Sequence, residues 1–206
     1  MSRCVIISGG DFCPVANLRA DDFIIACDKG YEYARLLGLV PNLIIGDFDS
    51  YSGELPRGIP TQTLPCEKDD TDTMHAVKYA VDKGFDEIML SCALGGRLDH
   101  LLANIQSCLY AVQRGVGAAM ADKSTDIRFL QKGSLTLPAV KNSSLSLLSA
   151  SEKCTGVCIS GVKYPLDRAV LLQSYPLGVS NEWTADEARV SVESGILMIV
   201  MSKKQI

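Results

Sequence analysis

The chain has 206 residues, of which 47% are hydrophobic and 21% are charged, and its formal net charge is -4 at pH 7. This composition is typical of a globular protein that is long enough for one large domain or two small ones. Nucleic-acid grooves and membrane surfaces need concentrated positive charge, so the acidic balance and the lack of a long Lys/Arg run argue against both kinds of partner. An anionic substrate would need a cation to accompany it.

The chain begins with a short apolar stretch, CVIIS, which is followed at once by Gly9, Gly10 and Asp11. An apolar stretch of this length is too short for a signal peptide or a membrane anchor. We therefore expect a strand and a turn here, in a cytoplasmic protein.

Short apolar runs alternate with helical segments over the first two thirds of the chain. The runs are CVIIS, FIIAC, NLIIG, EIMLSCA and GAAMA. One helix is predicted from the apolar face of Met74, Val77 and Val81, with Thr71 or Asp72 as its cap and Gly84 as its end. A second is predicted before Gly115 from the face of Leu98, Leu101, Leu102, Ile105 and Leu109. The alternation is typical of a parallel sheet covered by helices.

The helical periodicity disappears after about residue 130. The runs that follow are GSLTLP, SSLSLLSA, GVCISG, AVLLQS, ARVSVES and ILMIVMS, separated by Gly, Pro, Ser and Asn. Such spacing predicts a small antiparallel sandwich or barrel. The expected fold class is thus an N-terminal α/β domain with a parallel sheet, residues 1–131, followed by a smaller antiparallel β-sandwich domain, residues 132–206.

The eight cysteines are scattered along the chain and form no CxxC motif. Only Cys154 and Cys158 lie close together, and they have neither a second ligand pair nor a nearby histidine, so a zinc site is not favoured. We expect reduced cysteines that pack in the core.

Acidic residues and glycines follow the apolar runs, at the edge of a parallel sheet where ligands bind. They are Gly9, Gly10, Asp28, Gly30, Gly46, Asp47, Asp49, Ser50, Gly95, Gly96, Arg97, Asp99 and His100, and a helix start adds Lys68, Asp69, Asp70, Thr71 and Asp72. Converging carboxylates repel one another, and their burial without a partner is costly. Several aspartates at one edge therefore imply a hard cation.

Oxygen ligands without a cysteine or a histidine pair suit Mg²⁺, which typically binds one or two carboxylates together with substrate phosphates. Glycine turns let backbone amides approach phosphate oxygens, and Lys68 and Arg97 can supply positive charge. The pattern predicts phosphoryl chemistry. Neither the GxxxxGK[ST] motif of P-loop enzymes nor the HRD and DFG motifs of protein kinases occurs.

Each of these residues also has a purely structural interpretation. Asp28 and Asp72 could be helix caps, and Asp69 could be a solvated loop charge. Arg97 could be a surface residue after a glycine turn, and His100 could be structural. These interpretations do not explain why four separate segments place Asp or Gly at the same predicted edge.

Several motifs together resemble the thiamine pyrophosphokinase family, also called thiamine diphosphokinases. They are CDKGYEYARLLGLVPNLIIGDFDS, KDDTDTMHA, GGRLDHLLAN, GVKYPL and GVSNE, in this order over nearly the whole chain. The resemblance implies an N-terminal domain for nucleotide, a C-terminal β-sandwich for thiamine, and a homodimer. It also implies transfer of pyrophosphate from ATP to the thiamine hydroxyl, with Mg²⁺ as cofactor and AMP as the other product.

The resemblance also implies roles for individual residues. Its catalytic and metal residues fall on Asp47, Asp49 and Asp72, with Arg97 as a catalytic phosphate contact. Its nucleotide and phosphate residues fall on Gly9, Gly10, Asp28, Lys68, Asp69, Thr71, Gly95 and Gly96. Its thiamine residues fall on Asp99, Ser180 and Asn181, and Trp183 or Tyr164 are candidates to stack on thiamine. One departure is Lys29, because the family usually has a glycine pair after the first aspartate.

Two other functions stay open from the residues. A diphosphokinase for another hydroxymethyl heterocycle, such as a pterin, would keep the aspartates and GGR but change the C-terminal domain, and GVSNE argues against it. A non-catalytic regulator that binds nucleotide or thiamine could lose metal ligands, whereas Asp28, Asp47, Asp49 and Asp72 are all present.

Overall fold

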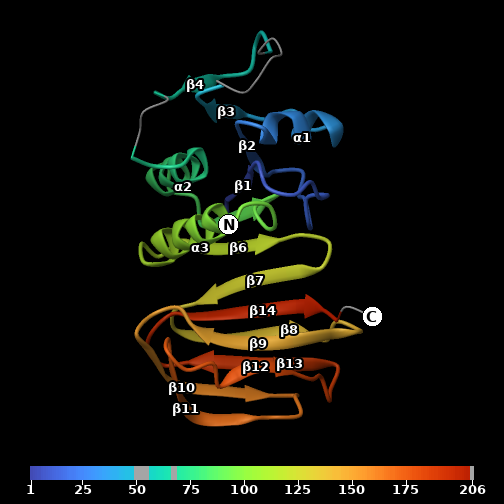
Figure 1. Ribbon diagram of the computed structural model, residues 1–206, viewed down its shortest axis with the longest axis vertical. Coiled ribbons are helices and arrows are strands. Elements are labelled where there is room, and N and C mark those ends of the chain that lie inside the picture. The colour runs from blue at the N-terminus through green and yellow to red at the C-terminus, as the bar shows by residue number, and fades with distance from the viewer. Residues whose placement is uncertain (49–55, 66–68, 205–206) are drawn as a thin grey trace. The chain divides into compact units, whose positions relative to one another are not determined.

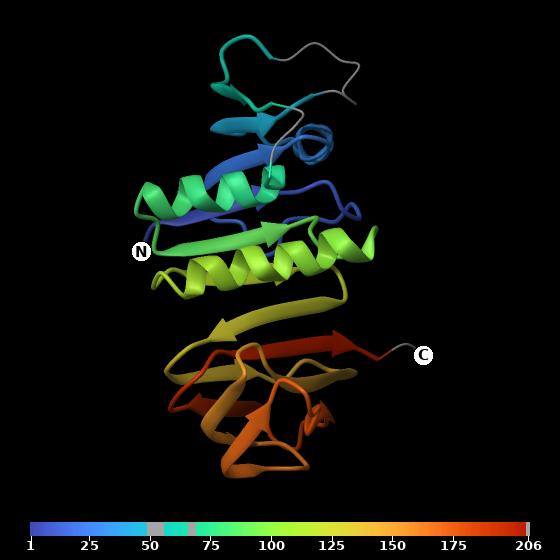
Figure 2. The same cartoon turned by 60° about the vertical axis from the view of Figure 1, so that its left-hand side comes forward.

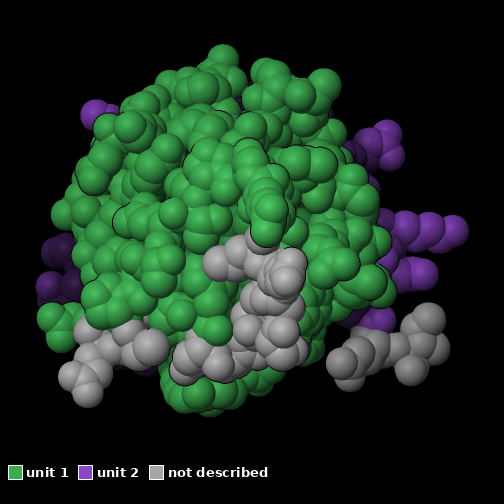
Figure 3. Space-filling view, turned by 90° about the horizontal axis from the view of Figure 1, so that it is seen from above, with its two compact units in different colours: residues 1–123 green, residues 124–206 purple. Residues whose placement is uncertain are grey.

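The structure is a computed structural model that describes residues 1–48, 56–65 and 69–204. The chain divides into two compact units, Met1–Lys123 and Ser124–Ile206, which are coloured separately in Figure 3. Each unit is described by itself below.

The first unit is an α/β domain built on a parallel sheet. Its strands are β1 (Arg3–Ile7), β2 (Phe23–Cys27), β3 (Leu43–Gly46), β4 (Thr61–Thr63), β5 (Glu87–Ser91) and β6 (Gly117–Ala121). They are ordered β6-β5-β1-β2-β3-β4, and every neighbouring pair is parallel. All five apolar runs predicted as strands in this unit form strands, and only the short β4 was not predicted.

Three helices cover this sheet in the described residues: α1 (Gly30–Leu36), α2 (Asp72–Asp82) and α3 (Leu98–Val112). Helices α2 and α3 lie side by side (Figures 1 and 2). Because successive strand residues point to opposite faces, Val5 and Ile7 pack with Tyr31 of α1, while Ile6 faces the other side of the sheet. Strands β1, β2, β3, β5 and β6 are buried on both faces over most of their length, as their continuous apolar runs predict, whereas the edge strand β4 is exposed.

Helix α2 has the predicted cap and end. The Thr71 side chain accepts a hydrogen bond from the Met74 amide at 3.1 Å, and Gly84 has a φ of 77° just past the helix. A threonine at this position satisfies an amide that the first turn of the helix leaves without a partner.

Helix α3 forms where predicted, but the predicted apolar face is not the face that packs on the sheet. Leu98 and Leu102 are 69% and 53% exposed. The buried side chains of the helix are Asn104, Ser107, Cys108, Ala111 and Val112. Small and polar residues let α3 lie close to the sheet and to α2. Leu98 and Leu102 are left on the outside, and Leu101, Ile105 and Leu109 are half-buried.

The second unit is an antiparallel β-sandwich, as predicted. Its strands are β7 (Thr125–Leu130), β8 (Gly133–Pro138), β9 (Ser143–Ser149), β10 (Lys153–Ser160), β11 (Leu166–Leu172), β12 (Gly178–Asn181), β13 (Glu187–Val192) and β14 (Leu197–Lys203). One sheet has the order β12-β9-β14-β7 and the other the order β11-β10-β13-β8. Leu145 of the first sheet and Val190 of the second belong to one buried cluster, so the two sheets share a core.

The division between the units falls at Lys123 and Ser124, eight residues before the end of the predicted first domain at residue 131. The difference is strand β7, Thr125–Leu130, which the sequence pattern did not identify. It pairs along its whole length with β14, from Thr125 opposite Ser202 to Leu130 opposite Leu197. This antiparallel pairing places the segment in the second unit.

Every cysteine in the described residues is free. Cys4, Cys13, Cys27, Cys92, Cys108 and Cys154 are buried, and Cys158 is half-buried. Burial raises the pKa of the Cys92 thiol to about 11, which favours the neutral, unreactive form. None of the helices in the described residues has the length and apolar character needed to cross a membrane.

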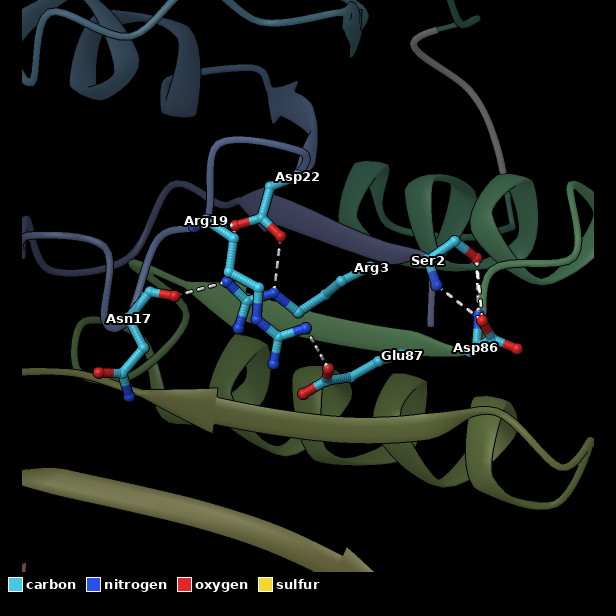
Figure 4. A network of polar contacts seen from close by, with 7 residues as sticks. All are labelled: Ser2, Arg3, Asn17, Arg19, Asp22, Asp86 and Glu87. Atoms are coloured by element: carbon cyan, nitrogen blue, oxygen red, sulfur yellow. Dashed lines mark hydrogen bonds and ion pairs between the residues drawn. The ribbon is translucent and has the colours of Figure 1, made fainter.

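A buried ion pair lies at the amino-terminal end of β1 (Figure 4). Arg3 Nε and Nη2 donate to the two carboxylate oxygens of Asp22 at 2.8 and 2.6 Å, and Nη2 also donates to the Asn17 carbonyl at 2.6 Å. The two side chains are only 3% and 1% exposed. The pair ties the loop before β2 to the start of the central strand.

Candidate active site

One cavity of about 580 Å³ lies at the carboxyl ends of the strands of the first unit. Segments that follow β1, β2, β3 and β5 border it, together with the first turns of α2 and α3. The predicted site residues that line it are Gly9, Gly10, Asp28, Asp47, Thr71, Asp72, Gly95, Gly96 and Arg97. The edge of the sheet that the sequence pattern predicted as a ligand site is therefore a real cavity.

The backbone is strained at three points that border this edge. Asp28, Phe48 and Cys92 have φ values of 51°, 58° and 53°, in the left-handed region that residues other than glycine rarely adopt. Each lies just after a strand, β2, β3 or β5. Such strain is typical of functional sites, where the surrounding structure fixes an unfavourable conformation to direct a side chain.

Two glycines are required by close backbone contacts. A Cβ at Gly10 would lie 2.7 Å from the Cys92 carbonyl oxygen, and one at Gly30 would lie 2.0 Å from the Ile7 carbonyl oxygen. The resemblance implies a glycine pair at positions 29 and 30, and Gly30 is the member of it that the packing needs. Lys29, where the other glycine would be, instead borders the cavity and adds a positive charge to it.

The N-termini of α2 and α3 both reach the cavity. Thr71 is the residue before the first turn of α2, and Arg97 is the residue before the first turn of α3. Unpaired amides and the helix dipole make such N-termini favourable places for anions. This part of the cavity is suited to phosphate groups.

Arg97 and Asp99 bind each other in a two-point contact. Arg97 Nε and Nη2 donate to the Asp99 carboxylate at 3.1 and 2.6 Å, and both side chains are largely exposed. The hydrogen bond from Arg97 lowers the pKa of Asp99, and the same bond raises the pKa of Arg97. Arg97 borders the cavity whereas Asp99 does not, so an anion in the cavity would compete with Asp99 or use the remaining nitrogen of Arg97.

Among the described residues, aspartates outnumber cations around the cavity. Asp11, Asp28, Asp47 and Asp72 border it, against Lys29 and Arg97. Yet no three or more His, Cys, Asp or Glu side chains in the described ranges are arranged to hold a metal by themselves. This donor set fits Mg²⁺, which keeps several waters and shares its remaining positions between one or two carboxylates and substrate phosphates.

Two described residues of the predicted site in the first unit, Asp69 and Asp99, do not line this cavity. Asp49 and Lys68 lie outside the described residues. Asp69 borders a separate cavity of about 480 Å³ between α2 and α3, where its neighbour Asp70 pairs with Lys78. Asp99 forms an ion pair with Arg97, as described above.

The two predicted thiamine residues of the second unit lie on β12. Ser180 is exposed, has a φ of 62°, and its amide donates to Ser146 Oγ at 2.9 Å. Asn181 is buried, and its side chain makes three hydrogen bonds to the backbone of Tyr164 and Glu182. Asn181 thus holds the segment around Tyr164 in place, and its contact with a ligand stays a prediction.

The two candidate stacking residues differ in exposure. Trp183 is half-buried against the sandwich core, and its Nε1 donates to Ser143 Oγ at 3.0 Å. Tyr164 is 59% exposed. Of the two, Tyr164 has the more accessible ring.

The sequence pattern did not identify every residue at the cavity. Ser8, Asp11, Cys27, Thr73, Ala93 and Asn104 also line it. Asp11 could have been found, because it follows the Gly9-Gly10 pair at the end of the first predicted strand. Asn104 had a weaker signal as the last residue of GGRLDHLLAN, and the buried hydroxyls of Ser8 and Thr73, 2.9 Å apart, had none.

Glycine loops, two helix N-termini, carboxylates and an arginine thus meet at one cavity at the edge of a parallel sheet. The first unit has the architecture of an α/β enzyme with a site suited to phosphate groups.

Comparisons with known proteins identify the family. The family model of the thiamin pyrophosphokinase catalytic domain matches residues 16–120, and that of the thiamin pyrophosphokinase vitamin B1 binding domain matches residues 134–197. The thiamine pyrophosphokinase of Bacillus subtilis is 30% identical over 184 residues, which is 86% of this chain and 86% of the relative.

Solved structures agree. A crystal structure of thiamine pyrophosphokinase from Bacillus subtilis matches with a TM-score of 0.90 and 25% identity, over 99% of this chain and 100% of that chain. One from Geobacillus thermodenitrificans matches with a TM-score of 0.84 and 26% identity, over 98% of each chain. The chain belongs to the thiamin pyrophosphokinase family, and it is an enzyme with thiamine pyrophosphokinase activity.

Proposed function

We propose that the chain transfers the pyrophosphoryl group of ATP to the hydroxyl of thiamine, which gives thiamine diphosphate and AMP. The observation that carries this proposal is the cavity of the first unit, where glycine loops, Asp28, Asp47, Asp72 and Arg97 meet. We assign nucleotide and catalysis to the first unit, residues 1–123, and thiamine recognition to the β-sandwich unit, residues 124–206.

Transfer of two phosphates requires that the thiamine hydroxyl attack the β-phosphorus while AMP leaves. The triphosphate must therefore be held with its middle phosphorus exposed. The amides at Gly9, Gly95 and Gly96 and those at the starts of α2 and α3 can hold its oxygens. The Gly10 amide already donates to the Cys92 carbonyl oxygen at 2.7 Å, so Gly10 contributes through the space that its missing side chain leaves. Arg97 adds charge-assisted hydrogen bonds where negative charge develops. Positioning carries most of the rate, because this chemistry needs little covalent help from the protein.

We propose two roles for the carboxylates of the cavity, to bind the cation and to accept a proton. Asp47 and Asp72, with Asp49 from outside the described residues, would hold Mg²⁺. When bound, Mg²⁺ neutralises charge on the phosphate oxygens. One aspartate of the cavity accepts the proton of the attacking hydroxyl. On the thiamine side we propose Asp99, Ser180 and Asn181 as contacts, in accordance with the family resemblance.

Product analysis tests the activity directly. The protein is incubated with ATP, Mg²⁺ and thiamine, and the products are separated by chromatography. AMP and thiamine diphosphate in equal amounts are the expected result. ADP with thiamine monophosphate would contradict pyrophosphoryl transfer, a product only with a hydroxymethylpterin would favour the pterin enzyme, and binding without turnover would favour a regulator.

Replacement of Arg97 by Lys should lower kcat/KM by about 10- to 100-fold. Lysine keeps the positive charge but loses the planar fork that binds two phosphate oxygens at once. The matched control is Arg114→Lys, since Arg114 stacks on Tyr110 near the other end of α3. Steady-state kinetics at saturating Mg²⁺ measure both variants. Equal kcat/KM values would make Arg97 a surface residue.

We also propose a homodimer. Support comes from the family resemblance and from exposed apolar side chains, which are unfavourable in a monomer. Leu98 and Leu102 are exposed on α3, and Val170, Leu172, Tyr175, Leu177 and Val179 are exposed in the second unit. Light scattering after size-exclusion chromatography should give twice the mass of one chain, and a single-chain mass at micromolar concentration would contradict the dimer.

A cytoplasmic location is proposed as well. The free cysteines of the described residues support it, because oxidising compartments favour disulfides. The acidic net charge supports the proposal that neither nucleic acid nor a membrane is a partner.

A further inference from the structure

Asn104 is a buried amide side chain at the wall of the active-site cavity. It is 7% exposed and lies on the inner face of α3, one turn after His100 and two turns after Arg97, which border the same cavity. A polar side chain at such a depth normally has all of its hydrogen-bonding groups satisfied.

The described residues satisfy only one end of the Asn104 amide. Its Nδ2 donates to the Ala93 carbonyl oxygen at 2.9 Å. Because a carbonyl oxygen can only accept, the nitrogen must be the atom that faces Ala93, and this fixes the orientation of the amide. Among the described residues, Oδ1 has no hydrogen-bond partner.

The chemistry of Oδ1 restricts what can bind it. An amide oxygen accepts hydrogen bonds and does not take up a proton at neutral pH. Phosphate oxygens that carry no hydrogen cannot be its partner. The partner must bring an O–H or an N–H group into the cavity. ATP and thiamine each carry hydroxyl and amino groups of this kind.

We propose that Asn104 is a substrate-binding residue whose Oδ1 accepts a hydrogen bond from an O–H or N–H group of one substrate. This inference rests on the proposed function, which supplies the two substrates. The bond from Nδ2 to Ala93 keeps Oδ1 in place, because it ties the side chain to the segment that leads into Gly95, Gly96 and Arg97. The amide is thus oriented before the substrate arrives.

Separate binding measurements on the two substrates test the proposal. Asn104→Leu removes the acceptor and keeps an apolar side chain of similar size. Titration calorimetry measures the affinity for a non-hydrolysable ATP analogue with Mg²⁺, and then for thiamine with that analogue at saturation. We expect about a tenfold or greater loss of affinity for one ligand and less than a twofold change for the other. The ligand that is weakened is the one that supplies the donor.

Ser107→Ala is the matched control. Ser107 lies on the same buried face of α3, is 2% exposed, donates to the Ala103 carbonyl within the helix, and does not border this cavity. It should leave both affinities unchanged. If Asn104→Leu does not fold, as judged by circular dichroism, Asn104→Ala removes the same oxygen with less bulk and passes through the same two titrations.

The outcomes separate this inference from the proposed function. If both affinities stay within twofold of the wild type, or both fall by the same factor, Asn104 only supports the loop and the inference is wrong. The wild-type protein would still form AMP and thiamine diphosphate in that case. If the wild type forms no such products, the proposed function itself fails.

Discussion

Replacement of Asp47 by Asn should abolish most of the turnover, by at least about 100-fold, without unfolding the protein. Asp47 follows β3, borders the cavity and precedes Phe48, whose left-handed backbone turns the chain at this point. Asparagine has nearly the same shape but no charge, so it would weaken the binding of Mg²⁺ and leave the packing intact. The variant should therefore need much more Mg²⁺ for half-maximal activity.

The measurement is the initial rate of AMP formation over a Mg²⁺ titration, with thermal unfolding as the check on folding. Asp82→Asn is the matched control, because Asp82 is an exposed aspartate at the end of α2, away from the cavity. It should behave as the wild type. A near-wild-type rate for Asp47→Asn at limiting Mg²⁺ would remove Asp47 from the metal site. The same result is expected for Asp49→Asn on the basis of the sequence.

The fold was largely predictable because its two kinds of strand have different patterns. Continuous apolar runs such as FIIAC match strands buried on both faces, and alternating runs such as SSLSLLS match strands buried on one face. Strands β7 and β12 were not predicted because the prediction relied on such apolar runs. Neither TDIRFL nor GVSN contains a continuous apolar run, and each has only one buried residue.

The sequence predicted that a ligand site lies at the carboxyl edge of the sheet. It did not predict the residues that form the inner wall of the cavity. Residues that end a strand with Asp or Gly can be recognised along the chain, whereas Ser8, Thr73 and Asn104 come from strand ends and helices that reveal no ligand role by themselves. The face of α3 was wrongly predicted because leucine spacing indicates an apolar face and does not say what covers it. The pairing of Arg97 with Asp99 depends on side-chain conformation, which no sequence pattern gives.

Replacement of Asp22 by Asn should lower the free energy of unfolding of the first unit by about 3–5 kcal/mol. The Arg3 guanidinium would stay buried and charged, but it would face a neutral amide instead of the carboxylate that now binds Nε and Nη2. A buried charge without its partner is among the most costly defects in a protein. Because the pair lies at the amino-terminal end of β1, away from the cavity, kcat should stay unchanged under conditions where the variant is folded.

Two spectroscopic signals separate the units in a urea titration. The helices of the described residues, α1, α2 and α3, belong to the first unit, so circular dichroism at 222 nm reports on that unit. Trp183 is the sole tryptophan of the chain and lies in the second unit, so its fluorescence reports on the sandwich. In Asp22→Asn the urea midpoint of the dichroism signal should fall. The urea midpoint of the fluorescence signal should stay unchanged if the second unit unfolds independently.

The effect should also depend on pH. Burial by itself would raise the pKa of Asp22, but the hydrogen bonds from Arg3 and Arg19 and their positive charges hold this pKa below its ordinary value. The unfolded chain then binds the proton more readily than the folded one, so the pair stabilises the fold fully above the ordinary aspartate pKa of about 3.9. The difference between wild type and Asp22→Asn should be constant above that pH and shrink as the pH falls through the lowered pKa.

A double variant distinguishes the loss of a useful interaction from the exposure of an unpaired charge. Arg3→Met with Asp22→Leu removes both charges and fills the space with apolar atoms, and such replacements of buried pairs are often neutral or stabilising. The double variant should recover most of the stability that Asp22→Asn loses. If it is as unstable as the single variant, the hydrogen bonds that it loses at Asn17 and at the Arg19 amide cost as much as the unpaired charge does. If Asp22→Asn itself unfolds at the wild-type urea concentration, the ion pair contributes nothing to the fold.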